Sequence, residues 1–251
     1  MKNFKLTVEY DGTKFNGWQV QAQNERTIQG KIEQALKIIF KKRIRLYGSG
    51  RTDSGVHASG QVANFKTSTQ KSDNEILNAI NANLPPDISI INIQEVPLDF
   101  HSQYSAKRKT YRYTILNRKA RSAQNRNFYL HFPHTLNVTA MRQDIKNLVG
   151  KKDFRSFMAS DTALRKTGKT KKTVRTIYDA KIQKKGDLIY IDITANGFLY
   201  KMVRNIAGTL IAVGTGKMPK GSIHQILQKK DRILAGDTAP AKGLCLLQVE
   251  Y

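Results

Sequence analysis

Hydrophobic positions along the chain follow two spacings that predict different elements. Alternation with polar residues, or short runs rich in branched and aromatic residues, predicts strands at 4–10, 44–47, 61–67, 88–96, 109–116, 174–183, 188–195 and 244–251. Apolar residues three and four apart predict helices at 28–39, 74–83, 137–149, 198–213 and 222–228. Thr27 is a plausible N-cap for the first helix, and either Ser72 or Asp73 for the second.

The order of these elements predicts two similar halves. Strands and helices follow one another as β, α, β, β, α, β in the first half, and the second half repeats this order loosely. We therefore expect an α+β fold of two lobes, each a largely antiparallel, mixed sheet with helices packed on one face. The expected domains are residues 1–106 and 107–251.

Length and composition exclude several classes of protein. The 251 residues contain no apolar run approaching the ~18 residues that a membrane span needs. The first ten residues carry Lys2, Lys5 and Glu9 and lack the apolar region of a signal peptide. A single cysteine, Cys245, excludes an internal disulfide framework and a multi-cysteine metal site. We expect a cytoplasmic protein without a membrane partner.

The charge balance indicates a polyanionic partner. Lys and Arg number 43 against 19 Asp and Glu, a formal net charge of +24. Such a chain attracts nucleic acid, although a basic surface can also serve solubility alone. The basic residues gather in three groups, at 41–45, 107–112 and 165–175. Because these groups fall largely in expected loops, a folded RNA is a better match than a straight duplex groove.

One glycine-punctuated loop is the strongest candidate for a site. Residues 48–58 read Gly-Ser-Gly-Arg-Thr-Asp-Ser-Gly-Val-His-Ala, with Arg51 and Asp53 two positions apart. Glycines permit backbone conformations and close approaches that other residues resist. The rival interpretation is an aspartate that merely caps a turn. His57 is more easily understood as a support of this loop than as a catalytic group.

Five ordered motifs resemble the tRNA pseudouridine synthase A family over the whole chain. They are Tyr10–Gly12 with Phe15–Gln19, Gly50–Ala58, Phe100-His101 with Ala106–Tyr113, Phe198–Gly208, and Pro240-Ala241 with Gly243-Leu244 and Val249–Tyr251. Ser54 stands where the family usually has alanine. The resemblance implies the two-lobed pseudouridine synthase fold and isomerisation of uridine at positions 38, 39 and 40, in the anticodon arm of tRNA. It also implies a homodimer in which each tRNA contacts both subunits, and no metal or organic cofactor.

The same resemblance assigns catalytic roles. Asp53 is implied to be the catalytic carboxylate, which attacks C1′, attacks C6 or removes the ribose 2′ proton; the sequence does not choose among these. Arg204 is implied to pair with Asp53 and favour its ionised form; the rival role for Arg204 is phosphate binding. Tyr111 is implied to stack on the uracil and relay its C5 proton, with core packing as the rival.

Further residues are expected to contact the substrate. Arg51 is expected to hold the target base out of its stack or to fill the gap that the base leaves. By resemblance, Leu244 lines the pocket unless it is simply core. The residues expected to bind RNA are Lys107, Arg108, Lys169, Lys171 and Lys172. The alternative function is a catalytically silent tRNA-binding or RNA-chaperone protein on the same fold. A methyltransferase is disfavoured because the early turn at 11–13 lacks a glycine-rich cofactor loop.

Overall fold

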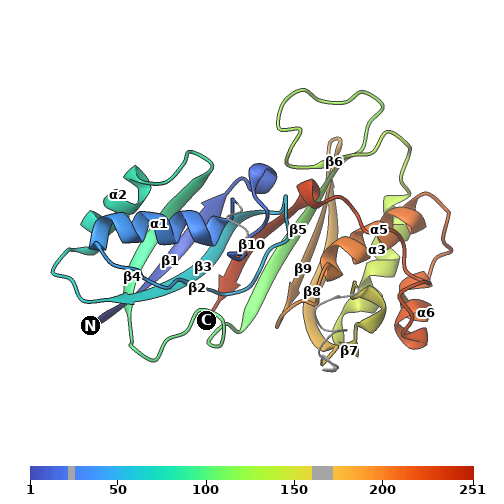
Figure 1. Ribbon diagram of the computed structural model, residues 1–251. Helices are drawn as coiled ribbons and strands as arrows, with labels where there is room; N and C mark the ends of the chain where they lie inside the picture. The colour runs from blue at the N-terminus through green and yellow to red at the C-terminus, as the bar shows by residue number, and fades with distance from the viewer. Residues whose placement is uncertain (22–25, 160–171) are drawn as a thin grey trace. The chain divides into compact units, whose positions relative to one another are not determined.

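The chain folds into two compact units, shown in the computed structural model of Figure 1. The structure describes residues 1–21, 26–159 and 172–251. The first unit comprises Met1–Lys107 and Cys245–Tyr251, and the second comprises Arg108–Leu244. Each unit contains a mixed, largely antiparallel sheet with helices against it, which confirms the expected α+β class.

The sheet of the first unit has the strand order β4-β1-β3-β10. Its strands are β1 (Lys2–Tyr10), β3 (His57–Thr67), β4 (Ile88–Val96) and β10 (Leu244–Glu250), and the short β2 (Tyr47–Gly48) pairs with β3. β1 is antiparallel to both β3 and β4. β10 runs parallel to β3, with Cys245 opposite His57.

Strand alternation builds the core of this unit. Phe4, Leu6 and Val8 of β1 are fully buried on one face, and the ring of Phe4 stacks on Phe65 of β3 at 5.4 Å between centroids. Phe40, the last residue of α1 (Ile28–Phe40), adds its ring to Phe65 at 6.1 Å. Burying each such side chain contributes roughly 1.5–3 kcal/mol. The apolar side of α1 is thereby fixed to this face.

Side-chain caps define where the helices of the first unit begin. Thr27 accepts a hydrogen bond from the backbone N–H of Gly30, which confirms it as the N-cap of α1. Ser72 caps α2 (Asp73–Ala82) through a capping box with Glu75, so Ser72 rather than Asp73 is the cap. Each cap satisfies a backbone donor that the helix itself leaves unpaired.

The second unit repeats the layered arrangement. Its sheet has the order β5-β9-β8-β7, with β6 beside β5. The strands are β5 (Arg108–Leu116), β6 (Leu130–His131), β7 (Gly150–Asp153), β8 (Val174–Lys185) and β9 (Leu188–Ala195), and the helices α3 (Val138–Ile145), α5 (Met202–Gly214) and α6 (Ser222–Lys229). α3 packs against β8 and α5 against β5, while α3 also contacts α5 and α6.

Two expected helices are shorter than their apolar patterns suggested. The helix expected from Phe198 begins at Met202, because Lys201 adopts a left-handed conformation with φ of 56° that interrupts the helix. The helix expected to reach Val149 ends at Ile145 and continues only as a 3-10 turn. The expected strand at 44–47 is likewise reduced to the two residues of β2.

The last strand differs from the expected division of the chain. We expected all of residues 107–251 in the second lobe, whereas Cys245–Tyr251 clusters with the first unit. The cause is the pairing of β10 with β3. The two strands pass very close at Gly60, where a Cβ would lie 2.2 Å from the carbonyl oxygen of Leu247.

Of the helices in the described ranges, none is long and apolar enough to span a membrane.

Candidate active site

The loop that carries Asp53 connects β2 to β3 and is fastened to the first strand and the turn that follows it. Thr52 is buried, and its carbonyl accepts a hydrogen bond from the Trp18 N–H at 3.1 Å. The Thr52 hydroxyl shares a buried 2.8 Å hydrogen bond with the phenol of Tyr10. Asp53 itself is half-buried, and its carbonyl accepts from the N–H of Val56, closing a tight turn. The backbone on both sides of the carboxylate is thus fixed.

A second contact holds the far side of the turn. The carbonyl of Phe15 accepts from the N–H of Gly55 at 3.3 Å and from the hydroxyl of Ser54 at 3.1 Å. Ser54, the departure from the family motif, therefore adds a hydrogen bond that alanine lacks. The backbone of Gly17 also passes close to the loop. Its φ is 90°, and a Cβ at this position would lie 2.6 Å from the Thr52 carbonyl oxygen, so glycine is needed there.

The start of the loop is anchored by Gln61. Its side-chain oxygen accepts from the hydroxyl of Ser49 at 2.7 Å, and its side-chain amide donates to the carbonyl of Gly50 at 3.0 Å. The Ser49 N–H also donates to Val62. Arg51, which follows this anchored segment, is exposed. A rigid frame with one exposed arginine and one half-buried aspartate suits a site that meets a large substrate.

His57 lies behind the loop in the core of the unit. It is buried, and its Nδ1 accepts from the N–H of Gly12 at 3.1 Å. Asp11 Oδ1 lies 3.2 Å from the same ring nitrogen. That carboxylate oxygen already accepts from the N–H and hydroxyl of Thr13. These contacts favour the loop-supporting interpretation of His57.

The second unit carries Tyr111, Arg204 and Leu244. Tyr111 and Tyr113 lie on the same face of β5, and both are buried. The Tyr111 ring meets Phe198 edge-on at 5.1 Å between centroids. Tyr113 donates its hydroxyl to the carbonyl of Pro240 at 2.9 Å. Burial raises the pKa of the Tyr113 phenol, and the nearby positive charge of Arg204 opposes part of that rise.

Arg204 is a half-buried residue of α5 that holds a neighbouring segment. Its Nε donates to the carbonyl of Ala239 at 2.7 Å, and the N–H of Ala239 donates back to the Arg204 carbonyl at 3.1 Å. Tyr113 holds the next residue, Pro240, so β5 and α5 converge on one short segment. Leu244, four residues further on, is buried at the start of β10.

The residues expected to bind RNA are only partly described. Lys107, Arg108 and Lys172 are exposed, whereas Lys169 and Lys171 lie outside the described residues. The guanidinium of Arg108 lies 4.7 Å from the ring centroid of Tyr178.

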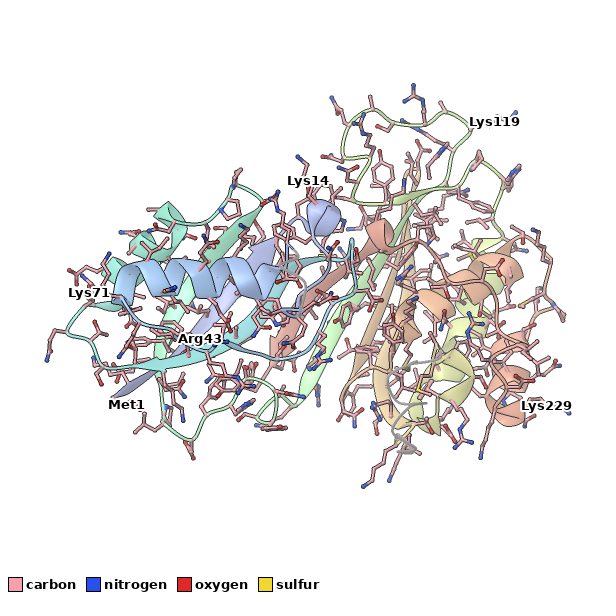
Figure 2. All side chains as sticks on the ribbon, in the orientation of Figure 1. Met1, Lys14, Arg43, Lys71, Lys119 and Lys229 are labelled. Carbon is pink, nitrogen blue, oxygen red and sulfur yellow. The ribbon has the colours of Figure 1, made fainter. Side chains whose placement is uncertain are left out.

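A further basic loop, between β5 and β6, lies outside the motifs and the three basic groups. Arg118, Lys119, Arg121 and Arg126 are exposed on it, and Figure 2 shows Lys119 at the outside of this loop. The loop is ordered by its own contacts, such as the 2.6 Å hydrogen bond from Tyr129 to the carbonyl of Gln124. The sequence does indicate this basic loop, because residues 100–143 contain no Asp or Glu.

Lys109 lies within the Ala106–Tyr113 motif, but the sequence assigns it no role of its own. It lies on β5 on the same face as Tyr111, and burial lowers the pKa of its amine to about 8.

Within the part of the chain that the structure covers, no three His, Cys, Asp or Glu side chains gather as a metal site would require.

Comparison with known proteins gives matches along nearly the full chain. The family described as tRNA pseudouridine synthase matches residues 6–105 and 145–251. The chain is 47% identical to the tRNA pseudouridine synthase A of Caldicellulosiruptor bescii and 45% identical to that of Thermoanaerobacter sp. strain X514. It is 46% identical to the tRNA pseudouridine synthase A 2 of Clostridium perfringens. Each alignment spans 251 residues and the whole of both chains.

Proposed function

Because the chain belongs to the tRNA pseudouridine synthase family, we propose that it isomerises uridine to pseudouridine in the anticodon arm of tRNA. The observation that carries this proposal is the family match over residues 6–105 and 145–251, combined with the Gly50–Ala58 motif around Asp53, which departs from the family pattern only at Ser54. The hydrogen bonds that hold the Asp53 loop support this proposal, because catalysis needs a carboxylate in a fixed position.

The reaction rearranges bonds without a net change in composition. The N1–C1′ bond breaks, the uracil turns, and C5 bonds to C1′; C5 then loses its proton while N1 gains one. Asp53 assists by attacking C1′ or C6, or by removing the 2′ proton, and each route begins from the ionised carboxylate. A covalent route divides one difficult step into two easier ones.

Three residues of the second unit would complete the chemistry. Arg204 would pair with Asp53 and keep its carboxylate ionised. Tyr111 would stack on the turning uracil and relay the C5 proton. Leu244 would supply an apolar wall of the pocket. The convergence of β5 and α5 on residues 239–240 supports this grouping, because it fixes Arg204 and the strand of Tyr111 relative to each other.

The remaining roles concern the RNA. An enzyme that acts on the glycosidic bond must take the nucleotide out of its stack, and the exposed Arg51 would hold it there. Lys107, Arg108, Lys169, Lys171 and Lys172 would bind phosphates, as the net charge of +24 favours. We further propose a homodimer with tRNA held by both subunits, acting in the cytoplasm on its tRNA substrate without a cofactor.

Mapping the product tests this function directly. Unmodified tRNA with uridines at positions 38, 39 and 40 is incubated with the protein, treated with a carbodiimide that forms a stable adduct on pseudouridine, and read by primer extension. We expect new stops in the anticodon arm only. Tight tRNA binding with no stop anywhere would instead favour the catalytically silent tRNA-binding protein, and stops confined to another arm would contradict the proposed site.

A further inference from the structure

A ladder of stacked side chains stands on the first unit outside the Asp53 loop. It runs from the Arg45 guanidinium, 5.1 Å from the ring centroid of Tyr47, to the His101 ring, 5.1 Å from Tyr47. The ring of Tyr104 continues it, 4.4 Å from His101 and tilted by 33°. Tyr104 nevertheless remains 80% exposed. We name these four residues the aromatic ladder.

Hydrogen bonds fix the turn that presents the outermost ring. The hydroxyl of Ser102 donates to the Tyr47 carbonyl at 2.5 Å, and the Ser102 N–H donates to the buried side chain of Asn64 at 2.9 Å. His101 Nδ1 accepts from the N–H of Gln103 at 3.1 Å, and the His101 carbonyl accepts from the Ser105 N–H. The exposed ring therefore sits on an ordered turn, which reduces the entropy lost on binding.

The surroundings of the ladder favour a nucleic acid as its occupant. Arg45 ends the ladder, and the exposed cations Lys41, Lys42 and Arg43 precede it in the chain. Aromatic rings beside cations are the combination that binds single-stranded RNA, with bases stacked on rings and phosphates on the cations. Within residues 99–105, the segment that contributes His101 and Tyr104, Asp99 is the only acidic residue.

The ladder is also connected to the candidate site through the chain. Tyr47 begins β2, and β2 leads directly into the loop that carries Arg51 and Asp53. We propose that Tyr104 and the ladder beneath it form a stacking platform for an unpaired tRNA base other than the target uridine. This inference rests on the proposed tRNA substrate, and it adds a binding site that supplies affinity and no chemistry.

Substitutions at Tyr104 separate stacking from simple apolar contact. Tyr104→Leu keeps an apolar side chain but removes the π-face, so tRNA should bind about tenfold more weakly, with a raised KM and an unchanged kcat. Tyr104→Phe keeps the ring and should bind within about twofold of wild type. Ile233→Ala, at an 88% exposed residue of the second unit, controls for loss of exposed apolar surface. Equal binding by Tyr104→Leu and wild type would overturn the proposal.

A fluorescent variant reads the stack without relying on catalysis. The single tryptophan of the chain, Trp18, is only 2% exposed, so Tyr104→Trp places a reporter on the platform. Stacked tRNA bases should quench its emission, while heparin, a polyanion without bases, should not. Equal quenching by heparin would contradict the stacking platform and indicate a site that recognises charge alone. A change in the oligomeric state of Tyr104→Leu, measured by analytical ultracentrifugation, would instead place Tyr104 in a contact between subunits. If neither the wild type nor any variant forms pseudouridine, the proposed function fails. The quenching of Tyr104→Trp by tRNA would still test whether a base stacks on the ladder.

Discussion

At the scale of single residues, the buried hydrogen bond between Tyr10 and Thr52 restrains the residue that precedes Asp53. Tyr10→Phe keeps the buried ring but removes its hydroxyl and so leaves the Thr52 hydroxyl without that partner. We expect a loss of about 1–2 kcal/mol in the free energy of unfolding. We also expect kcat to fall about tenfold or more, because small displacements of a reacting group are costly.

A matched control separates stability from positioning. Ser156→Ala removes another buried hydroxyl, which donates to the Ile226 carbonyl at 2.7 Å in the second unit. It should lower stability similarly in urea unfolding but leave kcat unchanged. If Tyr10→Phe also lost only stability, Tyr10 would have no role in positioning the loop.

Lys109 gives a prediction with a defined pH window. Its pKa falls from 10.5 to about 8 on folding because burial disfavours the charge. Between about pH 8 and 10 the unfolded chain thus holds a proton that the folded chain has released, so the stability of the folded state rises with pH. Lys109→Met should be more stable than wild type at pH 7, by at most about 3 kcal/mol.

The stability difference between Lys109→Met and wild type should shrink as the pH rises from 8 to 10. Urea unfolding at several pH values measures it, with the exposed Lys184→Met as the control for removing one positive charge. Measurements stop at pH 10, because burial raises the pKa of Tyr10, Tyr113 and Tyr251 and their ionisation then favours unfolding in every variant. A difference independent of pH would contradict the burial of the Lys109 amine.

At the scale of elements, α5 depends on a close backbone contact at Gly208. A Cβ there would lie 1.7 Å from the carbonyl oxygen of Asp237, so Gly208→Ala must displace the segment that Arg204 and Tyr113 hold. We expect a loss of stability above about 3 kcal/mol, or insoluble protein. Gly197→Ala is the control, since within 4 Å its Cβ would meet only the Arg175 side chain, at 3.8 Å. Equal thermal denaturation of both variants would contradict the packing described.

Local signals predicted most elements because they act within a few residues. Runs rich in branched residues placed β4 and β9, while apolar spacing and the candidate caps at Thr27 and at Ser72 or Asp73 placed α1 and α2. The start of α5 was missed because a left-handed conformation at Lys201, a non-glycine residue, leaves no local signal. The return of β10 to the first unit was missed because pairing between residues nearly 190 positions apart has no local pattern either.

The candidate site divides in the same way. Asp53 and Arg51 stand in a recognisable motif, so the sequence alone is enough to propose them as site residues. The partners that hold their loop, such as Tyr10 and Phe15, are brought there only by folding. Tyr104 likewise gains significance only when a turn sets its ring on His101.

At the scale of the whole molecule, the net charge of +24 predicts binding that weakens steeply with salt. The basic loop between β5 and β6 offers a test, because Lys119, Arg121 and Arg126 are exposed. Replacing all three with glutamine should reduce the slope of log Kd against log salt by about 2, since each phosphate contact contributes roughly 0.7–0.9.

A second triple variant controls for total charge. Lys217, Lys220 and Lys229 are exposed near α6, and their replacement by glutamine removes the same charge elsewhere. Filter binding at several salt concentrations compares the two variants. Equal slopes for both would mean that the β5–β6 loop makes no phosphate contact of its own.

The most direct test of the central claim is tritium release from tRNA carrying uridine labelled at C5, because isomerisation must expel that hydrogen. Wild type and Asp53→Asn are compared at equal tRNA occupancy, with binding measured separately. We expect release by wild type, no release by Asp53→Asn, and nearly equal binding by both. Release by Asp53→Asn at the wild-type rate would contradict the assignment of Asp53, and absence of release by either protein would contradict the proposed isomerisation.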